Sequence, residues 1–364
     1  MKRLSCGIVG LPNVGKSTLF NALTSNLAPA SNYPFCTIDP NVGIVEVMDN
    51  RLAPLSDLSH SERIVYATTQ FVDIAGLVAG ASQGEGLGNK FLANIRETDA
   101  IVHVVRCFES DDIVHVSGQV DPVRDIEVIN TELVLADLQM ISNVLAKVEK
   151  QAKTRKEMQP LLDLLILVND HLNQNQPART LTLSVEQLEM LKPYPLLTQK
   201  KILYAANVAE NDLPLMENHL VAQVRAYAAK EGTHVIPICA RLEEEVAQLP
   251  VEERASFLNS LGINEGGLQR LIRSSYSMLN LISFLTTGEM ETRAWTITQG
   301  ANAAEAAGEI HTDIQKGFIR AEVIRFEDLV TYGGRTGAKE AGKMRSEGKE
   351  YIVQDGDVIL FLHH

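Results

Sequence analysis

Cysteine is scarce in this sequence, with four residues in a chain of 364. They are Cys6, Cys36, Cys107 and Cys239, which stand far apart and form no Cys-x-x-Cys pair. A structural zinc site or a disulfide framework needs clustered or regularly spaced cysteines, so this spacing disfavours both. We therefore expect reduced thiols, as in cytoplasmic proteins.

Long apolar runs and an excess of basic residues are also missing. No stretch approaches the roughly 20 apolar residues of a membrane span, and the apolar run near Met1 is too short for a signal sequence. The formal net charge is -13, which argues against a protein that wraps nucleic acid over its whole surface but leaves room for a local basic patch. The sequence predicts a soluble cytoplasmic protein without a membrane partner.

What is present begins with a phosphate-binding loop at residues 10–17: a glycine, four residues, then Gly-Lys-Ser. A predicted strand precedes it and a predicted helix follows it, which favours this reading over a simple glycine-rich turn. Backbone N–H groups of such a loop wrap phosphate oxygens, Lys16 neutralises the β and γ charges, and the Ser17 hydroxyl can ligate Mg²⁺. The predicted nucleotide contacts here are Gly10, Pro12, Asn13, Val14, Gly15, Lys16, Ser17 and Thr18.

Two later segments are predicted to complete the metal and γ-phosphate site. Thr37 lies in a proline-punctuated loop, from which its hydroxyl can ligate Mg²⁺. One strand is expected from Ile64 to Val72, and Asp73 at its end can hold the metal through water. The amide of Gly76 is expected to sense the γ-phosphate, beside the catalytic Lys16. Leu77 follows, where many GTPases place the glutamine that orients water. Leucine has no donor or acceptor, so hydrolysis must recruit another group or be slow.

Two histidines have different contexts. His103 interrupts the apolar run 100–106, which is typical of a strand covered on both faces, and we interpret it as a core residue. His115 lies in the polar stretch 109–115, where the chain leaves the sheet. A histidine there could orient or deprotonate water, so His115 is the candidate catalytic residue. A surface histidine at a helix approach is the alternative.

The base is expected to contact two loops that follow apolar strands. Asn207, Val208 and Glu210 stand where a G domain has Asn-Lys-x-Asp, and a second loop consists of Cys239, Ala240 and Arg241. In the standard loop an aspartate accepts the two guanine donors. Here Glu210 is one methylene longer and Val208 replaces the lysine, which weakens the basis for guanine selection. ATP is at least as plausible a ligand as GTP.

The rest of the chain predicts helices and then a mixed domain. Apolar residues at helical spacing after Asp121, a polar tip at residues 150–156 and a returning apolar run predict an antiparallel helical hairpin. From residue 281, two short strands, a small-residue helix and a final strand predict an α+β domain. The expected fold class is α/β, a P-loop NTPase with a mostly parallel sheet. We divide it into a G domain over 1–123 and 201–279, a helical coiled-coil insertion over 124–200, and the C-terminal domain over 280–364.

With these motifs, essentially the whole chain resembles the YchF-type Obg-like ATPases, a family of Obg-related P-loop GTPases of the translation-factor class. The C-terminal segment resembles a TGS domain in Arg293-Ala294-Trp295-Thr296, in residues 308–313 and in residues 316–322. The resemblance implies a β-grasp fold for that domain and a preference for ATP. It also implies association with the ribosome, as 70S or large subunit, with the TGS domain and the hairpin facing RNA or protein. DNA binding is not expected.

Two finer points accompany the resemblance. Asn13, without a glutamine after Gly76, is shared with relatives that use K⁺ between the phosphates, so Asn13 either ligates K⁺ or only shapes the loop. Basic residues of the TGS-like segment are compatible with RNA binding, although acidic neighbours dilute them; the basic ones are Arg335, Lys339, Lys343, Arg345 and Lys349.

Two other functions stay open at this point. One is a guanine-selective GTPase translation factor in which Glu210 still binds guanine. The other is a scaffold that binds RNA or the ribosome, in which nucleotide only stabilises the fold and Leu77 marks lost catalysis.

Overall fold

The computed structural model describes residues 3–27, 29, 41–77, 86–115 and 118–364. Contacts divide the chain into two compact units, which are described one at a time. The P-loop unit consists of residues 5–25 and 71–271, and the C-terminal unit consists of residues 1–4, 26–70 and 272–364. The predicted hairpin falls within the P-loop unit, and the domain boundaries predicted from the sequence stay predictions.

A parallel sheet forms the centre of the P-loop unit, in the strand order β4-β1-β5-β6-β7. Its pairs β1–β5, β5–β6 and β6–β7 are parallel, so the carboxyl ends of these strands lie along one edge. All seven residues of β5 are buried, as a strand covered on both faces requires. Strand β4 begins in the C-terminal unit, where β2 lies beside it. The bounds are β1 (Ser5–Val9), β2 (Val42–Val47), β4 (Ala67–Asp73), β5 (Ala100–Arg106), β6 (Lys201–Asn207) and β7 (Val235–Ile238).

Helices connect these strands, as parallel pairing requires. Their ends follow local chemistry: the Asn218 side chain caps α7 by accepting from Val221 N at 2.9 Å, and Gly232 ends it with a φ of 66°. No helix in the described part of the chain combines the length and the apolar character needed to cross a membrane. The bounds are α1 (Lys16–Thr24), α3 (Gly86–Glu97), α7 (His219–Glu231), α8 (Ala240–Ala247), α9 (Val251–Ser260) and α10 (Gly267–Met278), the last of which runs on into the C-terminal unit.

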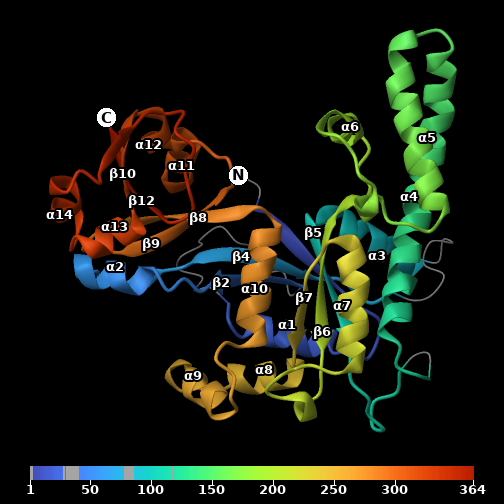
Figure 1. Cartoon of the computed structure of the whole chain (residues 1–364), viewed down its shortest axis with the longest axis horizontal. Coiled ribbons are helices and arrows are strands. Elements are labelled where there is room, and N and C mark those ends of the chain that lie inside the picture. The colour runs from blue at the N-terminus through green and yellow to red at the C-terminus, as the bar shows by residue number, and fades with distance from the viewer. Residues whose placement is uncertain (1–2, 28, 30–40, 78–85, 116–117) are drawn as a thin grey trace. The chain divides into compact units, whose positions relative to one another are not determined.

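The predicted hairpin consists of α4 (Pro122–Ala152) and α5 (Gln159–Asn173), which lie side by side in Figure 1. The Asp121 side chain caps α4 by accepting from Arg124 N at 3.1 Å, and proline occupies the first turn. The turn between the two helices contains the short helix η3 (Lys156–Met158). Buried apolar residues of both helices, such as Ile141 and Leu165, form one cluster. Helix α6 (Val185–Leu191) follows before the chain returns to β6.

The C-terminal unit contains a second, mixed sheet in the order β11-β10-β12-β8-β9-β3. Strands β8 and β9 form an antiparallel hairpin, β12 runs parallel to β8, and β10 is antiparallel to β12. The sequence missed β10 and the short helices after it. The bounds are β3 (Ile64–Val65), β8 (Leu281–Thr287), β9 (Thr292–Thr298), β10 (Phe318–Arg325), β11 (Arg345–Glu347), β12 (Asp357–His363), α11 (Ala303–Ile310), α12 (Thr312–Lys316), α13 (Phe326–Thr331) and α14 (Arg335–Glu340).

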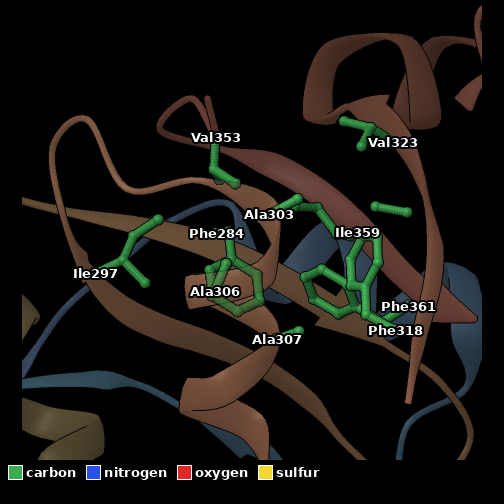
Figure 2. Close-up of a cluster of buried hydrophobic side chains, with 11 residues drawn as sticks. Phe284, Ile297, Ala303, Ala306, Ala307, Phe318, Val323, Val353, Ile359 and Phe361 are labelled. Atoms are coloured by element: carbon green, nitrogen blue, oxygen red, sulfur yellow. The ribbon is translucent and has the colours of Figure 1, made fainter. Parts of the chain in front are cut away.

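Helix α11 packs on this sheet over a core of small and aromatic residues (Figure 2). The helix contributes alanines, including Ala303 and Ala307, which let it approach the strands closely. The sheet contributes Phe284 and Phe361, whose ring centroids are 5.8 Å apart in an edge-on arrangement. This arrangement of one helix on a mixed sheet confirms the α+β architecture expected for the C-terminal segment.

The expectation of one continuous strand from Ile64 to Val72 was wrong, because this stretch divides between two sheets. Strand β3 pairs in parallel with β9 of the second sheet, and β4 joins the first sheet. Contacts with the hairpin β8–β9 hold β3 there: Glu62 N donates to Glu289 O at 2.8 Å, and Arg63 pairs with Glu291 at 2.8 Å. Helix α2 (Leu52–Ser59) also belongs to this unit. The partners lie over 200 residues away in the sequence, so local pattern did not predict them.

His103 is a core residue, as the apolar run of β5 predicted. Its side chain is fully buried, and its ring lies against Tyr204 with centroids 5.7 Å apart. Neither ring nitrogen has a hydrogen-bond partner among the described residues. Burial, with a smaller contribution from the charge of Arg179, lowers the pKa of His103 to about 3.

This pKa makes the stability of the protein depend on pH. In the unfolded chain a histidine binds a proton below a pH of about 6.5, whereas native His103 binds one only near pH 3. Between these values the unfolded state holds more protons, so stability falls as pH falls, by up to about 1.4 kcal/mol per pH unit. We expect His103→Phe to flatten this slope between about pH 6 and 4.5 in urea unfolding.

The control is His219→Phe, which removes an exposed histidine from the start of α7. It is expected to keep the slope of the unaltered protein. Equal slopes for His103→Phe and the unaltered protein would contradict the prediction.

Candidate nucleotide-binding site

A cavity of about 930 Å³ lies in the P-loop unit, where the strands of the parallel sheet end. Its walls come from the phosphate loop, the loop after β5, the loop after β6 and the start of α8. It brings together residues from sequence positions more than 200 apart. The predicted residues that line it are Gly10, Pro12, Asn13, Gly15, Lys16, Ser17, Thr18, Gly76, Asn207, Val208, Glu210, Cys239, Ala240 and Arg241.

Three of the predicted residues that the structure describes do not line this cavity. Val14 is buried with 1% exposure, Asp73 pairs with Lys16, and His115 is buried. Thr37 lies outside the described residues, so its predicted role as a metal ligand stays a prediction.

The phosphate loop owes its shape to two residues with left-handed backbone. Asn13 has a φ of 63°, and Gly15 has a φ of 95° and caps the start of α1. The turn closes onto the helix, where Leu19 N donates to Gly15 O at 3.0 Å. Helix α1 thus begins at the cavity. The first backbone N–H groups of a helix have no partner within the helix, and they are the groups that bind phosphate at a helix N-terminus.

The lysine of the loop is held by an acidic partner. Lys16 Nζ makes an ion pair and hydrogen bond with Asp73 Oδ1, and both side chains are largely buried. Asp73 is the last residue of β4, as the sequence predicted for an acidic residue at a strand end. The pair joins the phosphate loop to the segment that leads to Gly76.

Asn207 braces the two halves of the cavity. Its Nδ2 donates to Val14 O at 2.9 Å, and its Oδ1 accepts from Ala240 N at 3.0 Å. The side chain is 5% exposed, so this amide is committed to backbone groups of the phosphate loop and of α8. Although Asn207 lines the cavity, its contacts are those of a positioning residue.

The two base loops are tied to each other. Val208 N donates to Ile238 O at 2.9 Å, which holds the end of β6 to the end of β7. Glu210 is half-exposed, and its carboxylate lies 3.8 Å from Arg241 Nε. Cys239 is buried, and burial raises the pKa of its thiol. Polar groups of this part of the cavity therefore include the Glu210 carboxylate and the Arg241 guanidinium, the latter also 3.6 Å from Glu245.

His115 is not the exposed loop residue that the sequence suggested. It is 4% exposed, and its Nε2 lies 2.7 Å from Asp125 Oδ2 on the first turn of α4. Burial raises the pKa of the Asp125 carboxyl, and the hydrogen bond with His115 opposes this rise. The polar residues before His115 gave no sign of its contact with Asp125. The structure does not place His115 at the cavity.

The sequence missed the wall formed by the loop after β5. Phe108 and Ile113 line the cavity, together with Glu109 and Ser110. The buried guanidinium of Arg106 shapes this loop by donating to Phe108 O at 3.1 Å and to Ile113 O at 2.8 Å, and it lies 4.6 Å from the centre of the Phe108 ring. The sequence feature that could have indicated this wall is Arg106, a charged residue at the end of an apolar strand.

A family model described as a 50S ribosome-binding GTPase matches residues 5–170, and the model YchF-GTPase_C, described as a protein of unknown function, matches residues 281–364. The chain is 56% identical over 357 residues to the ribosome-binding ATPase YchF of Haemophilus influenzae, and 53% identical over 360 residues to that of Bacillus subtilis. Each alignment covers 98% of this chain and 98% of the relative. The chain belongs to the YchF family.

The structural comparison agrees. The solved structure of the Schizosaccharomyces pombe YchF GTPase superposes with a TM-score of 0.89 at 36% identity, covering 99% of this chain and 98% of that one. This likeness confirms the predicted fold class, a P-loop NTPase followed by a second sheet. The cavity in this YchF-family chain is therefore built on a P-loop GTPase fold.

We expect Gly15→Ala to abolish nucleotide binding by this YchF-family protein. A Cβ on Gly15 would lie 2.1 Å from Asn207 Nδ2, and the φ of 95° strains any side chain. The clash breaks the amide brace, so ADP binding measured by calorimetry should weaken by at least about 100-fold. Gly232→Ala is the matched control, since its φ is 66° and its Cβ would meet no described atom within 4 Å. Equal ADP affinities of the two variants would refute this role of Gly15.

We expect His115→Ala to affect stability rather than chemistry. The substitution leaves the buried Asp125 carboxylate without this partner, at a cost of about 2–3 kcal/mol in unfolding free energy. The single-turnover rate of the nucleotide-saturated protein should stay within about threefold of the unaltered rate. A rate loss of about 100-fold at unchanged stability would instead restore His115 as a catalytic residue.

Proposed function

We propose that this protein is a slow, Mg²⁺-dependent ATPase that acts as a switch on the ribosome, as its relatives' name, ribosome-binding ATPase, suggests. One observation carries the nucleotide part: a single cavity joins a phosphate loop to a base region where Asn207, Val208 and Glu210 stand in place of an Asn-Lys-x-Asp arrangement. Association with the ribosome rests on the named relatives, and we extend it to the 70S ribosome or the large subunit and to a cytoplasmic location.

The base region favours adenine by its hydrogen-bonding pattern. The adenine edge offers an acceptor at N1 and a donor at the exocyclic amine, whereas guanine offers two adjacent donors. Arg241 supplies a donor and Glu210 an acceptor, 3.8 Å apart. Guanine would need both of its donors to meet Glu210, whose carboxylate already lies beside the guanidinium. Phe108 and Val208 add apolar walls for the ring.

The phosphate end fits a magnesium nucleotide. Ser17 offers a hydroxyl at the start of α1 and Asp73 offers a carboxylate beside Lys16, and oxygen donors of these kinds suit Mg²⁺. When bound, Mg²⁺ would neutralise charge on the β and γ phosphates. Lys16 would stabilise the same developing charge and the Gly76 amide would contact the γ-phosphate. Thr37 remains the proposed further ligand.

Hydrolysis is proposed to be slow because the usual water-orienting residue is absent. Leu77 follows Gly76 and is 2% exposed, so it presents no polar group to water. GTP remains a possible weaker substrate. Asn13 keeps its proposed role toward K⁺; in the structure its Nδ2 donates to Val114 O at 3.1 Å.

The RNA-facing role of the C-terminal segment rests on the family more than on its basic residues. Arg335 pairs with Glu322, Lys343 lies 4.0 Å from Asp328, and Arg345 lies 3.3 Å from Glu347. These acidic partners compensate much of the basic charge that the sequence suggested as a patch.

Nucleotide preference is the decisive measurement. We expect calorimetry to show ATP binding about tenfold more tightly than GTP in the presence of Mg²⁺. Arg241→Ala should weaken ATP binding about tenfold while changing GTP binding by less than about threefold, because it removes the donor for adenine N1. Arg225→Ala is the matched control, since Arg225 pairs with Glu217 on the surface away from the cavity.

The alternatives predict other outcomes. Tighter binding of GTP than of ATP would favour a guanine-selective translation factor. Binding of ATP without turnover, alone or with purified ribosomes, would favour a nucleotide-stabilised scaffold.

A further inference from the structure

A second cavity, of about 260 Å³, lies within the C-terminal unit. Strand β9 forms one wall, and the first residues of β4 with Arg3 and Leu4 form another. It is separate from the nucleotide cavity and shares none of its residues. Its volume is slightly below the usual range for pockets that hold drug-sized ligands, so it would accept one small ring system rather than a folded chain.

A preformed stack of planar groups forms part of this wall. The Trp295 ring lies nearly parallel to the buried Phe284 ring, at 12° and 6.3 Å between centroids. The guanidinium of Arg293 lies over the Trp295 ring, 3.9 Å from the ring centre. Trp295 is further fixed because its Nε1 donates to Thr286 Oγ1 at 2.9 Å. Figure 2 shows Phe284 within the core that supports the stack.

Arg293 lines the cavity and its side chain is 21% exposed, so a ligand can reach its guanidinium. Glu291 lies 3.8 Å from Nη1 and holds one edge of the group. A guanidinium that is already held against Trp295 can stack on a nucleobase, and little conformational entropy is left to lose on binding.

The polar groups around the stack match a nucleotide. Arg3 is exposed and lines the cavity, and threonine hydroxyls from β4 and β9 line it as well, which suits an anionic phosphate. Glu309 supplies a carboxylate, which can accept from the exocyclic amine of a base.

We propose that this cavity, the Trp295 crevice, binds a single nucleotide unit whose base carries an exocyclic amine, tested here with adenine, with the base on Arg293 and the phosphate toward Arg3. The unit comes from a free nucleoside monophosphate or from an unpaired nucleotide of an RNA strand, which share this chemistry. The site does not depend on the proposed ATPase activity, since it lies outside the nucleotide cavity.

The chain offers a direct reporter for the test, because Trp295 is its only tryptophan. The probes are AMP, an oligoadenylate of about eight nucleotides and inorganic phosphate, titrated into full-length Lys16→Ala, in which nucleotide binding at the phosphate loop is removed. A second series uses the unaltered protein without ADP, because ADP carries the same adenine unit and would compete for the crevice. Trp295 fluorescence and calorimetry are recorded together.

We expect a saturable change with AMP that Arg293→Ala weakens by about tenfold or more. Arg293→Lys should weaken AMP binding nearly as much while leaving phosphate binding unchanged, since lysine keeps the charge but has no plane to stack. The matched control Arg325→Ala, which removes an exposed arginine at the end of β10, should bind as the unaltered protein does.

The outcomes show whether the ligand is a free nucleotide or part of an RNA strand, and they show whether the proposed binding occurs at all. Oligoadenylate binding at least about tenfold tighter than AMP, and lost in Arg293→Ala, identifies an RNA strand. Equal affinities identify a free nucleotide. The proposal is overturned if neither series shows saturable binding up to about 5 mM, or if Arg293→Ala binds AMP as well as Arg325→Ala does. Because ATP could also occupy the crevice, the ATP and GTP titrations are repeated in Arg293→Ala, which keeps failure here separable from failure of the proposed function.

Discussion

The nucleotide cavity depends on one side-chain amide. Asn207 joins the phosphate loop, through Val14 O, to the start of α8, through Ala240 N. These backbone groups belong to segments that the parallel sheet brings to the same edge but does not itself connect. The amide is almost fully buried, so water competes little for its hydrogen bonds. The glycine at position 15 is required for the same reason, because any side chain there would occupy the space of the amide.

Much of this fold could be predicted from the sequence, because its signals are local. The phosphate loop, the carboxylate at the end of β4 and the long helix after Asp121 each follow from residue types at fixed spacing over a few turns or one strand. The loops after β6 and β7 could be placed for a similar reason, since apolar strands predict the sheet edge at which they meet.

The errors concern side-chain contacts and a strand pairing that residue pattern alone does not reveal. His115 follows a polar stretch of sequence, and only the structure shows that its side chain is buried and hydrogen-bonded to Asp125. Arg106 ends an apolar strand, and only the fold shows that its guanidinium shapes the wall with Phe108. Residues 64 and 65 were expected to belong to one strand with residues 66–72, yet they pair with β9 in another sheet. For His115 and Arg106, a buried polar group needed a partner that the local pattern does not identify.

Strand β3 bears on how shortened forms of the protein are interpreted. Its pairing with β9, and the hydrogen bond from Ser61 Oγ to Gly288 O at 2.6 Å, mean that residues 61–65 complete a sheet encoded mostly by the last quarter of the gene. A chain truncated before residue 281 would keep β3 but lose its neighbours, and would expose unpaired backbone only a few residues upstream of Asp73. If such a fragment lost activity, the loss could therefore result from disruption of the segment that carries Asp73 as well as from the missing C-terminal sheet.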